Sequence, residues 1–345
     1  MKLLSIVFAL AVPVVAGCSG QALKQPSLPA LPVRSIGGDA AAKIGANATS
    51  QNVYWTLFYA RPNPQVEIAK LPLKATSQVT RIDGNGDNQF VCANAIRSVG
   101  SKLWVMNLSP CHASDSSIVQ VYSLPLTTHS KPTLTFVLSG PVDGDHMTFD
   151  ASGNLWVSSE GSNTVYEYTG PFTSSGTLQP AKRITLGLKT PQGLGFDSKG
   201  RLFVANTGTT SGKNAIAIFK PPISNSNPQF LKGVIAPSGL IFDRDGNLYV
   251  SSNGTPGGIA QYASNHLTAG DSPSIVDSKG IAPGEFGADL NFDNAGNLYD
   301  ADCGDKPGIY SYPTATKPFS STLAPSFYTN KSIKSVGCVW GISIH

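Results

Sequence analysis

At 345 residues, with only 13% of them charged, the chain could form two domains or one large β domain. The charged share is about half of the usual value, and Gly, Ser, Thr, Asn and Pro are abundant, which favours short strands and tight turns over helices with charged surfaces. The net charge of +4 comes without any run of Lys or Arg, so the clustered basic footprint expected of a nucleic-acid-binding protein is absent.

The chain begins with the layout of an export signal. Lys2 precedes an apolar run from Leu3 to Val15, which is too short to span a membrane, and small residues follow before Cys18. The stretch "VAGC" (15–18) resembles a bacterial lipobox. That resemblance implies cleavage before Cys18 and acylation of this cysteine, for example with palmitate, and two or more acyl chains give stable anchoring. An ordinary signal peptide that ends near an unrelated cysteine is the alternative.

Three segments are predicted from this pattern. Residues 1–17 form a lipoprotein signal peptide, and residues 18–48, rich in Pro, Ala, Ser and Gly, form the lipidated cysteine and a flexible tether. Residues 49–345 form the folded body. Ser19 stands in place of the Asp associated with inner-membrane retention, so the expected location is the bacterial cell envelope, anchored by lipid at the outer membrane.

One pattern recurs in the folded body. The copies "FDASGNLWVSS", "FDSKGRLFVAN", "FDRDGNLYVSS" and "FDNAGNLYDAD" begin at Phe149, Phe196, Phe242 and Phe292, and a weaker copy, "IRSVGSKLWVMN", precedes them. In each copy an apolar strand ends, Asp or Ser opens a turn, Gly supplies an unusual backbone angle, and a second strand begins. A third strand that ends in an aromatic residue follows. Repeats of this length built from strands predict the blades of a β-propeller.

The end of the chain predicts how the ring closes. "GISIH" (341–345) aligns with the first strand of a repeat, and its continuation is found at 52–60 and 64–71. The C-terminal strand is therefore expected to pair with the N-terminal blade, which also covers an edge that would otherwise be exposed. The fold class expected is all-β, a six-bladed β-propeller, with five or seven blades as alternatives.

The copies "PQGLGFDSKGRLFV" (191–204) and "PSGLIFDRDGNLYV" (237–250) resemble the repeats of the NHL-repeat and gluconolactonase-like six-bladed propellers. The resemblance covers about residues 49–345. It implies the propeller fold but not one function, because such propellers include both enzymes and interaction scaffolds.

Four cysteines remain after Cys18, and an even number in an exported protein suggests two disulfides among three possible connectivities. The repeat register places Cys92 near Cys111 in one blade, and Cys303 near Cys338 at the ring closure. The pairs 92–111 and 303–338 are therefore expected. A metal site is the alternative, although no CxxC or Cys–His spacing is present.

Propeller ligands usually bind where first strands begin and second strands end. The first-strand positions expected there are Cys92, Asp145, Gln192, Ser238, Ala288 and Trp340. The candidate ligand-binding rim is Asp145, His146, Glu160, Gln192, Asn206, Asn253, Asp289 and Asp302. His146 could act as a general base or be a packing histidine. One position of the second strand is aromatic in every copy, and its side chains are expected to pack between blades. The residues at this position are Trp104, Trp156, Phe203, Tyr249 and Tyr299.

The predicted function is that of a binding or protein-interaction module at the cell envelope, whose partner is a protein, a glycan or a small ligand. The alternative is a metal-dependent lactonase- or lyase-type enzyme with a divalent cation near Asp145, Glu160 and Asp302. In gluconolactonase-like enzymes Glu, Asn and Asp at first-strand entries hold such a metal, and only Asp145 matches that pattern here. No complete set of catalytic residues is recognised, no metal or other cofactor is assigned, and Trp340 is expected to fill the axis.

Overall fold

A computed structural model describes residues 51–57, 65–83, 92–108, 116–141, 143–208, 215–253, 258–277, 286–303 and 306–345. Cys18, the predicted signal peptide and the predicted tether lie outside these ranges. Within them, nearly all regular structure is β-strand, and the one helix, α1 (Lys331–Val336), has six residues. No helix in the described ranges is long and apolar enough to cross a membrane.

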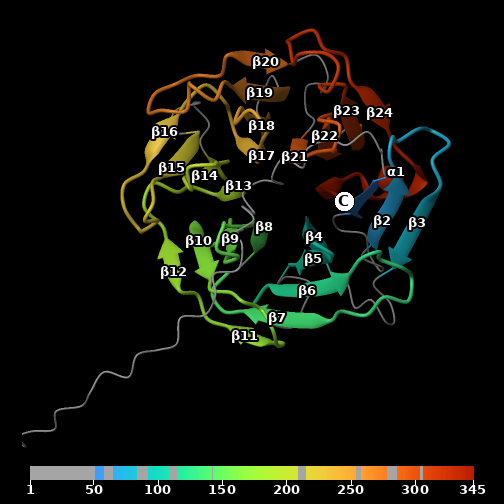
Figure 1. Ribbon diagram of the computed structural model, residues 1–345, viewed down its shortest axis with the longest axis horizontal. Coiled ribbons are helices and arrows are strands. Elements are labelled where there is room, and N and C mark those ends of the chain that lie inside the picture. The colour runs from blue at the N-terminus through green and yellow to red at the C-terminus, as the bar shows by residue number, and fades with distance from the viewer. Residues whose placement is uncertain are drawn as a thin grey trace, which may run out of the picture. The chain divides into compact units, whose positions relative to one another are not determined.

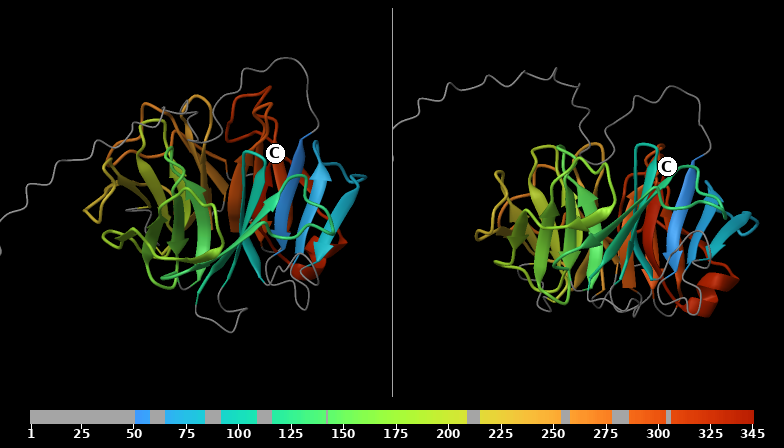
Figure 2. Two further views of the ribbon diagram at one scale, coloured as in Figure 1. Left: turned by 60° about the horizontal axis from the view of Figure 1, so that its bottom comes forward. Right: turned by 90° about the horizontal axis from the view of Figure 1, so that it is seen from below.

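Six β-sheets surround one axis, which confirms the predicted propeller and its six blades (Figure 1). Figure 2 shows the blades from the side, with their strands running along the axis. Each blade is named here in chain order, and its strands are given from the axis outward.

The first three blades have these strands. Blade 1 contains β25 (Val339–Ile344), β1 (Asn52–Leu57), β2 (Gln65–Lys70) and β3 (Val79–Asp83). Blade 2 contains β4 (Ala93–Val99), β5 (Lys102–Asn107), β6 (Ile118–Ser123), β7 (Leu134–Leu138) and, at its outer edge, β11 (Gly176–Leu178). Blade 3 contains β8 (Gly144–Phe149), β9 (Leu155–Ser159), β10 (Thr164–Tyr168) and β12 (Lys182–Ile184).

The other three blades have four strands each. Blade 4 contains β13 (Pro191–Phe196), β14 (Leu202–Asn206), β15 (Ile216–Phe219) and β16 (Gln229–Leu231). Blade 5 contains β17 (Pro237–Phe242), β18 (Leu248–Ser252), β19 (Gly258–Tyr262) and β20 (Ile275–Asp277). Blade 6 contains β21 (Phe286–Phe292), β22 (Leu298–Cys303), β23 (Gly308–Tyr312) and β24 (Ser326–Tyr328).

The ring closes as predicted, because the last strand of the chain is the innermost strand of the first blade. β25 pairs antiparallel with β1, with Ile344 opposite Val53 and Ile342 opposite Trp55. The backbones of Asn52 and His345 exchange two hydrogen bonds of 2.8 and 2.9 Å. The last strand of the chain is thus paired with the first described strand, which leaves no open edge at this point of the ring.

The repeated Asp of the sequence motif stabilises the hairpin turn. In blade 5 the Asp243 carboxylate accepts hydrogen bonds from the backbone N–H groups of Asp245 and Asn247 at 2.9 and 2.8 Å, and from the Asn247 amide at 2.8 Å. Gly246 adopts φ of 80°, a left-handed value that favours glycine. The same arrangement recurs at Asp150 and Asp197, so these carboxylates have a structural role in the turns.

The blades pack against one another through aromatic pairs, as the sequence predicted. Each first-strand Phe meets the second-strand aromatic residue of the preceding blade edge to face, at centroid distances between 4.8 and 5.6 Å. The pairs are Phe149–Trp104, Phe196–Trp156, Phe242–Phe203 and Phe292–Tyr249.

One of the two predicted disulfides lies within the described residues. Cys303, at the end of β22, is bonded to Cys338, which directly precedes β25, so the bond joins blade 6 to the closing strand. Cys92 is also a disulfide cysteine, whereas its predicted partner Cys111 lies outside the described residues.

Candidate functional site

Every blade has a β-bulge in its first strand, at the same place in each repeat. The pairing between the first and second strands shifts register there, for example between Pro191 and Leu194 in blade 4. A bulge bends the strand and redirects its side chains. The residues at this level of the axis form what we call the entry mouth: Asn94, Asp145, His146, Gln192, Ser238, Ala288 and Trp340.

The prediction of Cys92 at this level is wrong, because Asn94 occupies the equivalent place. In blade 3 Phe149 pairs with Leu155, whereas in blade 2 Ser98 pairs with Leu103, so the hairpin turn of blade 2 is one residue shorter. Because this turn is shorter, the first strand of blade 2 aligns with the other first strands two residues later than the sequence motif predicted, at Asn94 instead of Cys92.

His146 and Asp145 form a buried pair at the entry mouth, with exposed fractions of 2% and 5%. The His146 Nδ1 atom lies 3.3 Å from Asp145 Oδ2, and Nε2 lies 3.0 Å from the carbonyl oxygen of Ala288. Both neighbouring atoms are acceptors, so the ring satisfies both when it is protonated and donates twice. Burial lowers the pKa of His146, but the hydrogen bond and charge of Asp145 and the charge of Asp289 outweigh it, and the pKa is raised.

A histidine held in this way has no lone pair directed at a substrate. The geometry therefore favours the packing role of His146 over the general-base role. Asn94 completes the pair, because its amide donates to the Asp145 carbonyl at 3.1 Å and to Asp145 Oδ1 at 3.3 Å. The sequence motif did not single out Asn94, which follows Cys92 by two residues.

The free energy of unfolding is expected to fall as the pH rises above about 6.5, because the folded state holds the His146 proton more tightly than the unfolded state. This contribution is fully present below the unfolded pKa and is lost as the pH passes through the folded pKa. His146→Gln should remove that part of the slope, and His129→Gln, on an exposed loop, should leave it unchanged. Urea unfolding near pH 6 and near pH 8 measures the difference. An equal slope in His146→Gln and the unaltered protein would contradict the assignment.

Two of the remaining predicted rim residues contact each other. Glu160 follows β9 and accepts a hydrogen bond of 3.4 Å from Gln192, so these two residues lie together. Burial and the nearby Asp145 charge raise the pKa of Glu160, while the Gln192 hydrogen bond opposes that change. Asn206 instead holds a loop, since its amide donates to Gly187 O at 2.9 Å.

Asn253 and Asp302 lie at the ends of second strands, β18 and β22. The backbone N–H of Asn253 donates to Ala236 O at 2.9 Å, at the end of β18. Asp302 lies within β22 and is fully buried. Asp289 belongs to a different contact, in which it binds Arg97.

The residues at the entry mouth fit a divalent cation poorly. Asp145 is already hydrogen-bonded to His146 and Asn94, and the equivalent places in the neighbouring blades hold Gln192, Ser238 and Ala288, which supply no charge. Among the described residues, no group of three or more His, Cys, Asp or Glu side chains has the geometry to hold a metal ion.

An ion pair closes the axis beyond the entry mouth. Arg97 of β4 binds Asp289 of β21 through both terminal nitrogens, at 2.7 and 2.9 Å. Arg97 also donates to the Ile342 carbonyl of β25 at 3.1 Å, and the Ile342 N–H donates to Asp289 at 3.2 Å. Three blades that meet at the ring closure are thus bound together. Trp340, expected from the sequence to fill the axis, is half-buried at the entry mouth, with its ring 6.4 Å from that of His146.

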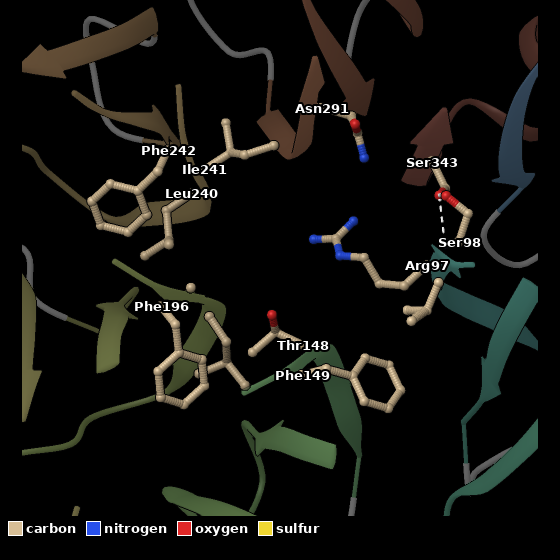
Figure 3. Close-up of a pocket in the computed structure, with 13 residues that line it drawn as sticks. Arg97, Ser98, Thr148, Phe149, Phe196, Leu240, Ile241, Phe242, Asn291 and Ser343 are labelled. Atoms are coloured by element: carbon tan, nitrogen blue, oxygen red, sulfur yellow. Dashed lines mark hydrogen bonds between the residues drawn. The ribbon is translucent and has the colours of Figure 1, made fainter. Parts of the chain in front are cut away.

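A pocket of about 120 Å³ lies on the other side of this ion pair (Figure 3). We call it the axial pocket. One residue from each blade lines it at a common level, where each first-strand residue pairs with the second-strand aromatic residue of its own blade. These six residues are Arg97, Thr148, Gly195, Ile241, Asn291 and Ser343.

No protein-family model and no curated protein sequence matches the chain. Solved structures do resemble it. One from Bacteroides uniformis, provisionally assigned as a 6-phosphogluconolactonase, has a TM-score of 0.57 and 12% identity, and covers 81% of this chain and 83% of its own. A similarly assigned structure from Bacteroides fragilis has a TM-score of 0.56 and 11% identity, and covers 88% of this chain and 99% of its own. A protein of unknown function from Bacteroides caccae has a TM-score of 0.54 and 14% identity, and covers 86% of this chain and 99% of its own. At these identities the likeness establishes the fold alone.

Proposed function

We propose that this protein is a lipid-anchored binding module of the bacterial cell envelope that takes a ligand in the axial pocket without chemical conversion. The observation that carries the proposal is the axial pocket itself, which is lined by Arg97, the partner of Asp289, and by first-strand residues of all six blades. The lining of this pocket, all of it described, contains no Asp, Glu, His or Cys. A general acid, base or thiol nucleophile is therefore missing where a ligand has room to enter.

The enzyme alternative depends on the entry mouth. Glu160 supports it to a degree, because its raised pKa would suit an acid catalyst. The carboxylate and imidazole of Asp145 and His146 are nevertheless bound to each other and to neighbouring protein atoms. The donor set is thus better suited to holding the blades together than to polarising a lactone. Stoichiometric divalent metal in the purified protein would overturn the proposal of a non-catalytic module.

The proposed location follows from the N-terminal sequence. Acylation of Cys18 would place the propeller at the end of a tether at the outer membrane, within reach of ligands in the envelope. This part of the proposal rests on the "VAGC" stretch and on Ser19.

Cys18→Ala is expected to release the protein from the membrane fraction, because the variant lacks the sulfur that receives the acyl chains. Fractionation of cells, followed by mass measurement of the mature N-terminus, tests this. Ser19→Ala is the matched control and should remain membrane-bound and acylated. A Cys18→Ala variant that stays fully in the membrane fraction would contradict the anchor.

A further inference from the structure

We propose that the axial pocket binds an uncharged, ring-sized molecule that carries a hydroxyl or amide group on one edge. This inference rests on the proposed function, which places the ligand in this pocket, and it adds the chemical class of that ligand. Three observations carry the inference. The pocket wall has a polar side and an apolar side, its one charged residue already has a counter-charge, and its volume is about 120 Å³.

The pocket has a polar side and an apolar side. Figure 3 shows the Thr148 hydroxyl and the Asn291 amide directed into the space around the Arg97 guanidinium. Ser343 lies next to Ser98, to whose hydroxyl it donates a hydrogen bond of 3.0 Å. These residues belong to blades 1, 2, 3 and 6, which are contiguous around the ring. The two remaining blades supply Gly195, which has no side chain, and otherwise only apolar side chains, from Leu194, Phe196, Leu240, Ile241 and Phe242.

A ligand that fills such a pocket must present different groups to its two sides. An apolar face gains free energy against the Leu and Phe side chains, because it is removed from water there. A hydroxyl or amide on the opposite edge can exchange hydrogen bonds with Thr148 and Asn291. A wholly apolar ligand would offer no hydrogen bond to the Thr148 hydroxyl or to the Asn291 amide oxygen, whereas the Asn291 amide nitrogen donates to the Ile342 carbonyl at 3.4 Å.

The charge of Arg97 is already compensated. It is the one charged residue among the described lining, and both of its terminal nitrogens donate to Asp289. A ligand carboxylate would compete with this bidentate partner, and a ligand ammonium would meet the positive guanidinium. An uncharged ligand avoids both costs.

The volume sets the size of the buried group. A cavity of roughly 150 Å³ lined by Leu, Ile and Phe side chains admits benzene. The axial pocket has about 120 Å³ and a comparable apolar wall on one side. A single six-membered ring is therefore the largest group that we expect it to enclose.

The test titrates the full mature protein with four single-ring probes: phenol, benzene, benzoate and benzylammonium. We expect phenol to bind about tenfold more tightly than each of the others, as one added hydrogen bond or one avoided charge penalty would give. Thr148→Val, which keeps the side-chain shape but removes the hydroxyl, should weaken phenol about tenfold and leave benzene unchanged. Thr177→Val, exposed on β11, is the matched control and should change neither.

A second variant separates this inference from the proposed function. Gly195→Leu should abolish binding of every probe. A Cβ at this position would lie 2.6 Å from Leu240 Cδ1, so the new side chain must either fill the apolar side of the pocket or push the Leu240 side chain into the pocket. If a charged probe matches phenol and Gly195→Leu abolishes its binding, the pocket stands and the uncharged class is wrong. If benzene matches phenol, or Thr148→Val leaves phenol binding unchanged, the polar-edge assignment is wrong. Absence of binding by all probes, or binding that Gly195→Leu leaves intact, would overturn both proposals.

Discussion

Asp289→Ala is expected to lower the free energy of unfolding by about 3 to 5 kcal/mol, the usual cost of removing one partner from a buried ion pair. Asp289 is 1% exposed, and the Arg97 side chain that it binds is 17% exposed. Without the carboxylate, the guanidinium would remain on the axis without its counter-charge, and the Ile342 N–H would lose an acceptor. Urea unfolding of the variant and the unaltered protein measures the loss.

Two further variants make this result interpretable. Asp245→Ala removes an exposed carboxylate from a hairpin turn and should change stability by no more than about 0.5 kcal/mol. The double replacement Arg97→Met with Asp289→Leu should recover much of the stability that Asp289→Ala loses, since no charge is left unpaired. A loss below about 1 kcal/mol in Asp289→Ala would contradict the role assigned to the ion pair.

Deletion of residues 338–345 is expected to abolish the cooperative unfolding transition of the whole propeller. β25 places Val339, Ile342 and Ile344 in the core at 3% exposure or less, and it pairs along the length of β1. Its loss would uncover the inner edge of blade 1 and the adjoining faces of its neighbours, and blades in a closed ring depend on their neighbours for burial. Thermal unfolding followed by circular dichroism tests this.

The controls separate the strand from the other features near it. A protein lacking residues 19–48 should melt like the full chain, because these residues are predicted to form a tether and every described strand follows them in the chain. Cys303→Ala with Cys338→Ala should melt at a lower temperature but still in one transition, because the strand pairing is retained. A truncated protein that kept its cooperative melt at the original temperature would show that β25 does not close the ring.

The sequence predicted those features that depend on local pattern. The Asp and Gly of each hairpin turn, the alternating strands and the match between 341–345 and the first strands were all visible as short motifs, and together they specify six blades and their closure. The partner of Cys303 could be predicted because the repeat register brought Cys338 beside it.

The features that were missed depend on pairing between distant segments. Arg97 stands in an ordinary repeat, and only the assembled ring shows that it meets Asp289, which is 192 residues away in the chain. β11 pairs in parallel with β7 of the preceding blade, although its short Gly-Thr-Leu sequence carries no strand pattern. The sequence pointed to the entry mouth because its residues are polar, but the structure shows that Asp145 and His146 hydrogen-bond to each other, to Asn94 and to Ala288.

The most direct test of the account is to locate a bound ring-sized probe, because the central claim places the ligand in the axial pocket and not at the entry mouth. Methyl-labelled protein can be titrated with phenol and followed by NMR. We predict saturable shifts of the Leu194, Leu240 and Ile241 methyl signals, with the Ala288 methyl at the entry mouth unchanged. Saturable shifts at Ala288 without shifts at Leu240 would contradict the account.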